Sequence, residues 1–266
     1  WKLKRETSAL QRKVELRTNS VAQTFERICT VLVGLGYLGE DGESVTDLGT
    51  RLRRLYTEKD LLTAECLRSG AWKGLDAPSL AAAVSALVHE SRRDVVGETP
   101  RMPNRDVADA LERTHELWSV IDDALVMHRL PEMAAPDAGL AWAAHRWASG
   151  QGLETVLRDE DLTAGDFVRR CRQLVDVLDQ IAAATDDDGI RRAARKAIKG
   201  VQRGVVADAE HRAQARVERA VTAVRGDDGL RPACLHTAGP DAVVDQRLQF
   251  GQRPAAHRLG RRGLLE

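Results

Sequence analysis

Aromatic residues are scarce in this chain of 266 residues, in which Phe, Trp and Tyr make up 4% of the sequence. Net charge is absent as well, because 40 Lys and Arg residues balance 40 Asp and Glu residues. The overall charge therefore indicates no partner, and any basic surface must be local. The sequence also has no apolar run that could cross a bilayer and no secretory signal, so we expect a cytoplasmic protein without a membrane partner.

Cysteines are few, and they lie far apart at positions 29, 66, 171 and 234. The first three lie among apolar residues at helical spacing, which is typical of thiols packed in a core. We interpret them as free cysteines of a protein from a reducing compartment.

The motifs of common catalytic sites are missing too. The sequence contains no G-x-x-x-x-G-K-[ST] phosphate loop, no H-E-x-x-H and no G-x-S-x-G. "GLGYLG" matches G-x-G-x-x-G at positions 34 to 39, but a predicted helix precedes it and the carboxylates of an acidic turn follow it. We interpret these residues as turn glycines. His115, His128 and His145 are not at metal-ligand spacing. We therefore expect no catalytic residue, metal or cofactor in this chain.

Helical periodicity dominates what the sequence does contain. Within residues 1–33 the apolar positions recur at intervals of three, four and seven: Leu3, Leu10, Val14, Val21, Phe25, Ile28 and Leu32. The first part is charged, like one strand of a stalk, and from about Val21 the helix is expected to be buried. Tyr37, Leu38, an acidic turn and Val45 then predict a short β-hairpin, and Thr46 is a predicted N-cap. These parts are typical of a winged-helix unit.

The remainder of the chain predicts further helices and a disordered tail. Asp76 and Pro78 indicate the start of one helix, and a long helix is predicted over residues 105–130. The apolar stripe of that long helix is predicted to include Val107, Leu111, Leu117, Trp118, Ile121, Leu125 and Val126. Residues 209–266 lack periodicity and are predicted to be disordered. The predicted fold class is all-α.

The helix predicted over residues 165–181 has an unusual start. Its apolar face is Phe167, Val168, Cys171, Leu174, Val175, Leu178 and Ile181. Arg169, Arg170 and Arg172 crowd its first two turns, where the helix dipole is positive and disfavours cations. Nearby carboxylates could offset these charges (Asp159, Glu160, Asp161 and Asp166), and so could the phosphates of a nucleic acid. The pattern leaves both explanations open.

Four stretches carry a resemblance to a known family: "LGYL", "EKDLLTAECLRSGAWKGL", "WASG" at residues 147–150, and "GDFVRR" from residue 165. Over about residues 1–208 the chain resembles the C-terminal DSHCT domain of DExH-box RNA helicases. These belong to the superfamily-two group that includes the exosome-associated Ski and Mtr helicases.

The resemblance implies a division of the chain into four parts. Residues 1–20 would be a stalk helix, 21–57 the remainder of a winged-helix unit, 58–208 the DSHCT helical bundle, and 209–266 a tail outside the family. The family's ATPase is a pair of RecA-like domains that precede this region, and the start at Trp1 rather than Met fits that expectation. ATP and Mg²⁺ would bind there, so this chain would not be active alone.

The resemblance also implies an RNA-binding site. The helix at residues 165–181 corresponds to the family's ratchet helix, which faces single-stranded RNA beside the RecA-like domains. Arg169 and Arg172 match basic positions of that helix, and Gln173 stands where eukaryotic relatives carry an arginine. Glu90 matches a glutamate that approaches the RNA. The implied partners are single-stranded RNA and the upstream RecA-like domains. A free-standing helical adaptor for proteins is the alternative.

Two residues of the "WASG" stretch are expected to be structural. We interpret Trp147 as a buried ring and Gly150 as the residue that ends a helix.

Overall fold

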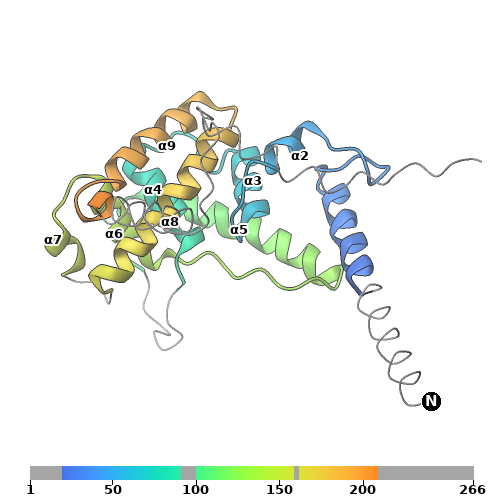
Figure 1. Ribbon diagram of the computed structural model, residues 1–266, viewed down its shortest axis with the longest axis horizontal. Helices are drawn as coiled ribbons and strands as arrows, with labels where there is room; N and C mark the ends of the chain where they lie inside the picture. The colour runs from blue at the N-terminus through green and yellow to red at the C-terminus, as the bar shows by residue number, and fades with distance from the viewer. Residues whose placement is uncertain (1–19, 91–99, 159–161, 209–266) are drawn as a thin grey trace, which may run out of the picture. The chain divides into compact units, whose positions relative to one another are not determined.

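Helices make up most of the computed structural model, which describes residues 20–90, 100–158 and 162–208 (Figure 1). Within these ranges no β-sheet forms, and the prediction of an all-α fold is confirmed. All of the described residues belong to one unit of the chain, residues 1–214. Most of the predicted stalk and all of the predicted tail lie outside the described residues.

The first described helix, residues 20–34, is more exposed than its sequence predicts. Val21 and Phe25 are 69% and 66% exposed, and Ile28 is 42% exposed. The prediction that this helix is buried from Val21 onward is therefore wrong. Apolar periodicity identifies a face without identifying its partner, and the described residues bury this helix only toward its end, where Val31 joins the core.

A tight turn follows this helix and rests on α2 (Asp47–Leu52). Gly36 has a φ of +81°, which a residue with a side chain rarely adopts, and ends the helix. The predicted hairpin amounts to one isolated antiparallel bridge between Leu38 and Val45. The hydroxyl of Thr46 accepts a hydrogen bond from the Gly49 amide at 3.1 Å, so the predicted N-cap is confirmed.

A buried hydrogen-bond network connects this turn to α3 (Asp60–Ser69). The hydroxyl of Tyr37, which is 2% exposed, donates to Oε1 of Glu65 over 2.7 Å. Arg68 forms an ion pair with the same carboxylate. Burial, followed by the hydrogen bond and charge of Glu65, raises the pKa of Tyr37 far above its ordinary value. The side chains of Tyr37 and Glu65 thus satisfy each other inside the core.

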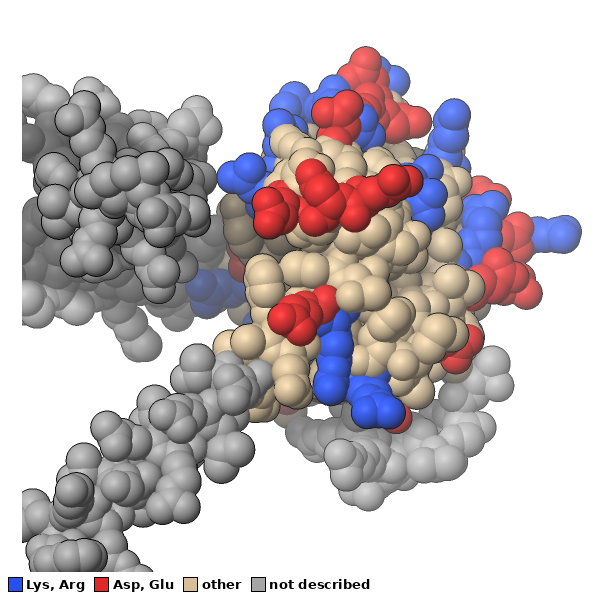
Figure 2. Space-filling model, turned by 90° about the vertical axis from the view of Figure 1, so that its right-hand side faces the viewer, with Lys and Arg blue, Asp and Glu red and all other residues tan. Residues whose placement is uncertain are grey.

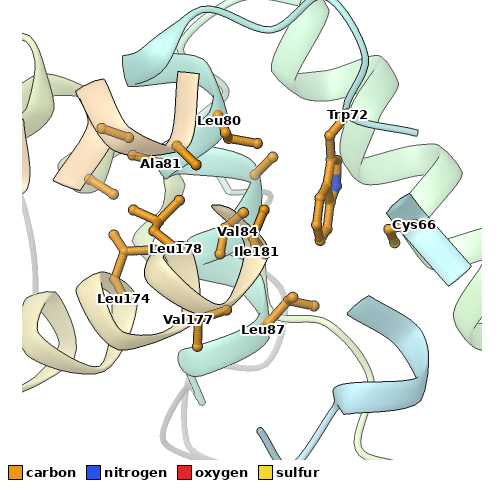
Figure 3. Packing of buried hydrophobic residues seen from close by; sticks show 14 of the residues in the cluster. Cys66, Trp72, Leu80, Ala81, Val84, Leu87, Leu174, Val177, Leu178 and Ile181 are labelled. Atoms are coloured by element: carbon orange, nitrogen blue, oxygen red, sulfur yellow. The ribbon is translucent and has the colours of Figure 1, made fainter. Parts of the chain in front are cut away.

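The central helix of the bundle is α4 (Ala77–Val88), in which every residue from 79 to 87 is buried. Asp76 caps it by accepting from the Ser79 amide at 2.9 Å, and Pro78 lies in its first turn, as predicted. Its surroundings are α5 (Arg105–Met127), η1 (Ala138–Leu140), α6 (Ala141–Ala148), α8 (Ala164–Ala184) and α9 (Asp188–Val201). Figure 3 shows Val84 beside Ile181 of α8. Its many alanines let neighbouring helices approach closely.

Helix α5 is shorter than predicted and its apolar stripe is only partly buried. It ends at Met127 rather than near residue 130, and Val126 at 50% exposure lies outside the core, contrary to the prediction. Its buried side includes Thr114, whose hydroxyl accepts a hydrogen bond from Nε1 of Trp72 at 3.1 Å. The Sγ atom of Cys66 lies 3.8 Å from the same hydroxyl.

The cysteines within the described ranges, Cys29, Cys66 and Cys171, are all free, and the second and third are buried. Burial raises the pKa of Cys66 to about 12, so its thiol stays protonated at neutral pH. Cys234 lies outside the described residues.

Trp147 and Gly150 have the structural roles predicted for them at the end of α6. Trp147 is 3% exposed, and its Nε1 donates to the Val201 carbonyl at 2.8 Å. Its ring meets Phe167 edge-on at 5.7 Å, and the guanidinium of Arg203 lies 3.6 Å from its centre. Gly150 has a φ of +97° just beyond the helix. A short helix, α7 (Leu153–Leu157), leads on to α8.

None of the helices in the described part of the chain combines the length and the apolar character that a membrane crossing requires.

Candidate nucleic-acid interface

Helix α8 carries the candidate site and begins at a reciprocal cap. The hydroxyl of Thr163 accepts from the Asp166 amide at 3.1 Å and donates to the Asp166 carboxylate at 2.9 Å. A carboxylate in the first turn also interacts favourably with the positive end of the helix dipole. The sequence therefore does place an acid where the dipole favours one.

The buried face of α8 anchors the helix in the bundle, as Figure 3 shows for Leu174, Val177, Leu178 and Ile181. The predicted face is confirmed for Phe167, Cys171, Leu174, Leu178 and Ile181. Val168 and Val175 are only partly buried, and Val177 takes part in the core although it was not predicted. The helix is turned slightly from the predicted orientation, because α4 and α9 cover it on two sides.

The three arginines at the start of α8 have three different surroundings. Arg169 forms an ion pair with Asp166 over 3.0 Å. Arg170 donates from Nη1 to the Val88 carbonyl at 2.7 Å. Arg172 is exposed and has no hydrogen bond or ion pair with another residue in the described ranges.

These contacts answer the question that the arginine cluster raises. Asp166 offsets the charge of Arg169, so an acid of the protein accounts for that position without any ligand. Arg170 lies at the start of its own helix but at the C-terminus of α4, where a cation is favoured. Of the three arginines, only Arg172 has no partner for its charge among the described residues. A ligand is therefore favoured by the exposure of Arg172, and not by the unfavourable position of the arginines in the helix dipole. The acidic run at residues 159–161 lies outside the described residues.

The polar face of α8 is open over its first half and partly covered over its second half. Arg169, Arg172, Gln173 and Asp176 are exposed along the first three turns. Farther on, residues 54–56 cover the helix. Arg54 donates to the Ala183 carbonyl at 3.0 Å, and the Tyr56 amide donates to Oε1 of Gln180 at 2.6 Å. We call the four exposed residues the open face of α8.

Glu90 lies near this open face, two residues beyond the end of α4. It is exposed, and the Arg170–Val88 hydrogen bond holds the end of α4 against the start of α8. The structure thus places Arg169, Arg172 and Gln173 on one helix surface and Glu90 on the adjoining helix end.

Comparison with known proteins identifies the family. The profile of the DSHCT (NUC185) domain matches residues 42–209, more than half of the chain. This chain belongs to the DSHCT family. The predicted membership is confirmed, and the match begins in the turn before α2.

Relatives of this DSHCT chain carry the name of a helicase. "Probable helicase HelY" of Mycobacterium leprae (strain TN) is 40% identical over 218 residues, which cover 77% of this chain and 24% of the relative. "Probable helicase HelY" of Mycobacterium tuberculosis (strain CDC 1551 / Oshkosh) is 38% identical over 220 residues, with the same coverage. The chain therefore spans about a quarter of the length of the curated relatives that it matches.

Two features of the DSHCT domain were not anticipated from the sequence. One is the role of Arg170, which contacts a carbonyl 82 residues earlier in the chain and so cannot be distinguished locally from Arg169. The other is a pocket of about 260 Å³ at the far end of α8, between α2, α3 and residues 184–187. Leu48, Leu55 and Leu67 line its interior, and Arg51 and Asp186 form an ion pair at its rim.

Charge is unevenly distributed over the surface of the DSHCT domain. Figure 2 shows one face on which a group of acidic side chains crosses an otherwise uncharged middle, while further acidic and basic side chains lie toward its edges. This arrangement agrees with the balanced composition and means that a basic surface has to be sought helix by helix.

Proposed function

We propose that this chain is the non-catalytic C-terminal region of an ATP-dependent DExH-box RNA helicase, and that α8 guides single-stranded RNA past the RecA-like motor. Membership of the DSHCT family and the helicase names of its relatives support the parent enzyme. The observation that carries the RNA-guiding role is the open face of α8, where exposed cations occupy the uncovered half of a helix that is otherwise anchored in the core. ATP and Mg²⁺ would bind the motor.

Three of the four residues of the open face contribute to this role, each in a different way. Arg172 has no ion-pair partner in the described ranges and can approach a phosphate without breaking another contact. Arg169 has to leave or share Asp166. Oε1 of Gln173 accepts from Nη1 of Arg170 at 3.4 Å, and its amide NH2 can donate to a base or a sugar hydroxyl. Arg172 should therefore contribute more of the electrostatic affinity than Arg169.

Glu90 fits a different part of the ligand. Its carboxylate only accepts hydrogen bonds at neutral pH and would repel a phosphate. From the end of α4 it would instead accept from an amino group of a base or from a ribose 2′-hydroxyl, and the second of these contacts would favour RNA over DNA. In this proposal the strand passes with its backbone on the arginine side and its sugar edge toward Glu90.

The test uses the full-length helicase that contains this region. Arg169→Ala together with Arg172→Ala should weaken RNA binding and reduce RNA-stimulated ATPase activity. The same variant should lower the salt slope of the binding constant by about 0.7 for each phosphate that is no longer neutralised. Arg172→Ala alone should have a larger effect than Arg169→Ala alone. The matched control is Arg53→Ala with Arg105→Ala, two exposed cations outside α8.

Unchanged RNA affinity, salt slope and ATPase activity in the α8 double variant would contradict the RNA-guiding role. If that variant still bound protein partners and the wild type never bound RNA or RecA-like domains, the adaptor alternative would be favoured.

A further inference from the structure

Helix α9 carries more positive charge than any other short stretch of the described residues. Its fourteen residues include one carboxylate, Asp188, and five cations: Arg191, Arg192, Arg195, Lys196 and Lys199. Arg191 forms an ion pair with Asp188 and donates to the Thr185 carbonyl, so it belongs to the junction between α8 and α9. The other four cations remain, in a protein whose net charge is zero.

These four cations form one row, which we call the α9 stripe: Arg192, Arg195, Lys196 and Lys199. They are spaced i, i+3, i+4 and i+7, so they lie on one side of the helix over about 10 Å. All four are exposed, and none has a hydrogen bond or ion pair with another residue of the described ranges. Like charges at these spacings repel and destabilise the helix, so the row has a cost that other contacts must offset.

The opposite side of α9 offsets that cost by packing in the core. Ile190, Ala193, Ala194, Ala197 and Val201 are buried. They pack against α4, α6 and α8. The stripe is therefore held on a rigid helix, with its charges directed away from the bundle.

We propose that the α9 stripe binds the sugar–phosphate backbone of a nucleic-acid strand, as a contact separate from the open face of α8. The choice of RNA as the strand rests on the function proposed above. The stripe contains only Arg and Lys, whose donors suit phosphate oxygens, and it has no aromatic or amide side chain that could read a base. The contact should therefore be independent of sequence and strongly dependent on salt.

The position of the stripe supports a path along both helices. Only residues 185–187 connect α8 to α9, and the two helices contact each other along their lengths, so they run antiparallel (Figure 1). The guanidinium of Arg203, just beyond α9, lies 3.6 Å from the centre of the Trp147 ring, and that ring meets Phe167 in the first turn of α8 at 5.7 Å. The end of α9 therefore lies beside the start of α8, where Arg169 and Arg172 are found.

A membrane surface is a poorer fit for the same charges. A helix that lies in a membrane interface inserts its apolar side among the lipids. The apolar side of α9 is already buried against α4, α6 and α8. An anionic lipid surface is therefore kept as an outcome of the test and not as the proposal.

The test measures binding of the 266-residue chain to a fluorescein-labelled single-stranded RNA of about 20 nucleotides at salt concentrations from about 50 to 200 mM. The α9 variant replaces all four stripe residues with Gln, which keeps helix propensity and removes the charge. Its matched control carries Gln at four exposed cations elsewhere: Arg53, Arg105, Arg129 and Arg158. A third variant is Arg169→Gln with Arg172→Gln. Circular dichroism verifies that all variants are folded.

The expected result for the α9 variant is a salt slope lowered by about 1.4 to 2.8, which corresponds to two to four phosphate contacts, and an affinity at least about tenfold weaker at the lowest salt. The control should keep most of its slope. Equal losses in both would show a general charge effect and would overturn the proposal. A loss in the α8 variant with none in the α9 variant would overturn it and leave the proposed function intact.

The opposite result would distinguish the proposed α9 contact from the proposed role of α8. A loss in the α9 variant with none in the α8 variant would support the stripe while contradicting the guiding role of α8. Binding of the wild type to phosphatidylserine vesicles, abolished in the α9 variant while RNA affinity is kept, would overturn the proposal in favour of a lipid surface.

Discussion

Helices α8 and α9 lie side by side, and both carry arginines in their first two turns. They differ in the side chains that pack them into the bundle and in the charges on their exposed sides. Phe167, Leu174 and Ile181 anchor α8 with large side chains, whereas α9 approaches its neighbours through alanines and Gly200. The polar face of α8 mixes both signs of charge and is partly covered over its second half by residues 54–56. The α9 stripe has one sign and stays open along its length.

The difference teaches that a cation's place on its own helix does not decide whether it is available to a ligand. Arg170 has its partner at the end of α4, and Arg169 has its partner three residues earlier. Among the first cations of α9, Arg191 forms an ion pair, whereas Arg192 forms none with the described residues. Whether a cation is available to a ligand depends on the neighbouring elements, and the dipole of its own helix gives no information about them.

The largest effect should come from the anchor of α8. Leu178→Ala removes a fully buried side chain between α8 and α4, and we expect the free energy of unfolding to fall by about 2–5 kcal/mol. Urea denaturation followed by circular dichroism measures it. The control is Gln173→Ala on the exposed side, for which we expect a change within about 0.5 kcal/mol. Equal losses would mean that α8 is not anchored through this face.

The next effect distinguishes the close packing of α9 from the open start of α8. A Cβ at Gly200 would lie 2.7 Å from the Ala148 carbonyl oxygen, so Gly200→Ala should destabilise the protein by about 1–3 kcal/mol. At Gly165 of α8 the nearest atom is 3.9 Å away, and alanine is the better helix former by up to about 1 kcal/mol. Gly165→Ala should therefore leave the melting temperature unchanged or raise it. A result of the same sign at both positions would contradict the comparison.

A smaller effect is expected at the cap of α8. Thr163→Ala removes the hydroxyl that accepts from the Asp166 amide, which should cost about 1 kcal/mol of unfolding free energy. Thr163→Ser keeps the hydroxyl and should restore most of the loss. Thermal denaturation of both variants checks this, and a loss in the Ser variant as large as in the Ala variant would show that the hydroxyl does not form the cap.

The smallest effect concerns the pH dependence of stability, in which the N-cap of α9 should differ from the N-cap of α8. Asp187 caps α9, and hydrogen bonds from the amides of Ile190 and Gly189 lower its pKa below the ordinary value of 3.8. Its contribution to stability is therefore complete above that value and is lost as the pH falls through the lower folded-state pKa. Asp187→Asn keeps a capping oxygen but cannot titrate, so acid denaturation should reduce its stability less steeply than that of the wild type. The Thr163 hydroxyl, which caps α8 by accepting from the Asp166 amide, does not itself titrate.

Local chemistry made much of the fold predictable. The caps at Thr46 and Asp76 combine a suitable side chain with a following apolar period, and both form as expected. The buried face of α8 follows from the 3.6-residue period because large apolar side chains alternate regularly with charged ones. The family resemblance added the membership that residues 42–209 confirm.

Features that depend on distant partners were not predictable in the same way. Phe25 and Val126 continue regular apolar stripes but lie outside the core, because periodicity does not state how far a neighbour extends. The candidate site was placed on the correct helix, but the division of its arginines depends on Val88 and Asp166, and its covered half depends on residues 54–56. The α9 stripe was not predicted from the sequence, because only the packing of α9 shows that its cations share one exposed side and form no ion pairs within the described part of the chain.

The central place of α4 has a consequence for the order in which this protein can assemble on the ribosome. Helix α4 ends at Val88, and α9, one of its main covers, begins at Asp188. Its nearly all-apolar surface therefore leaves the ribosome a hundred residues before its last neighbour is synthesised. During that interval the most hydrophobic helix of the bundle is covered only in part, by those neighbours that have already been synthesised, so it is the segment of the nascent chain on which a chaperone would act.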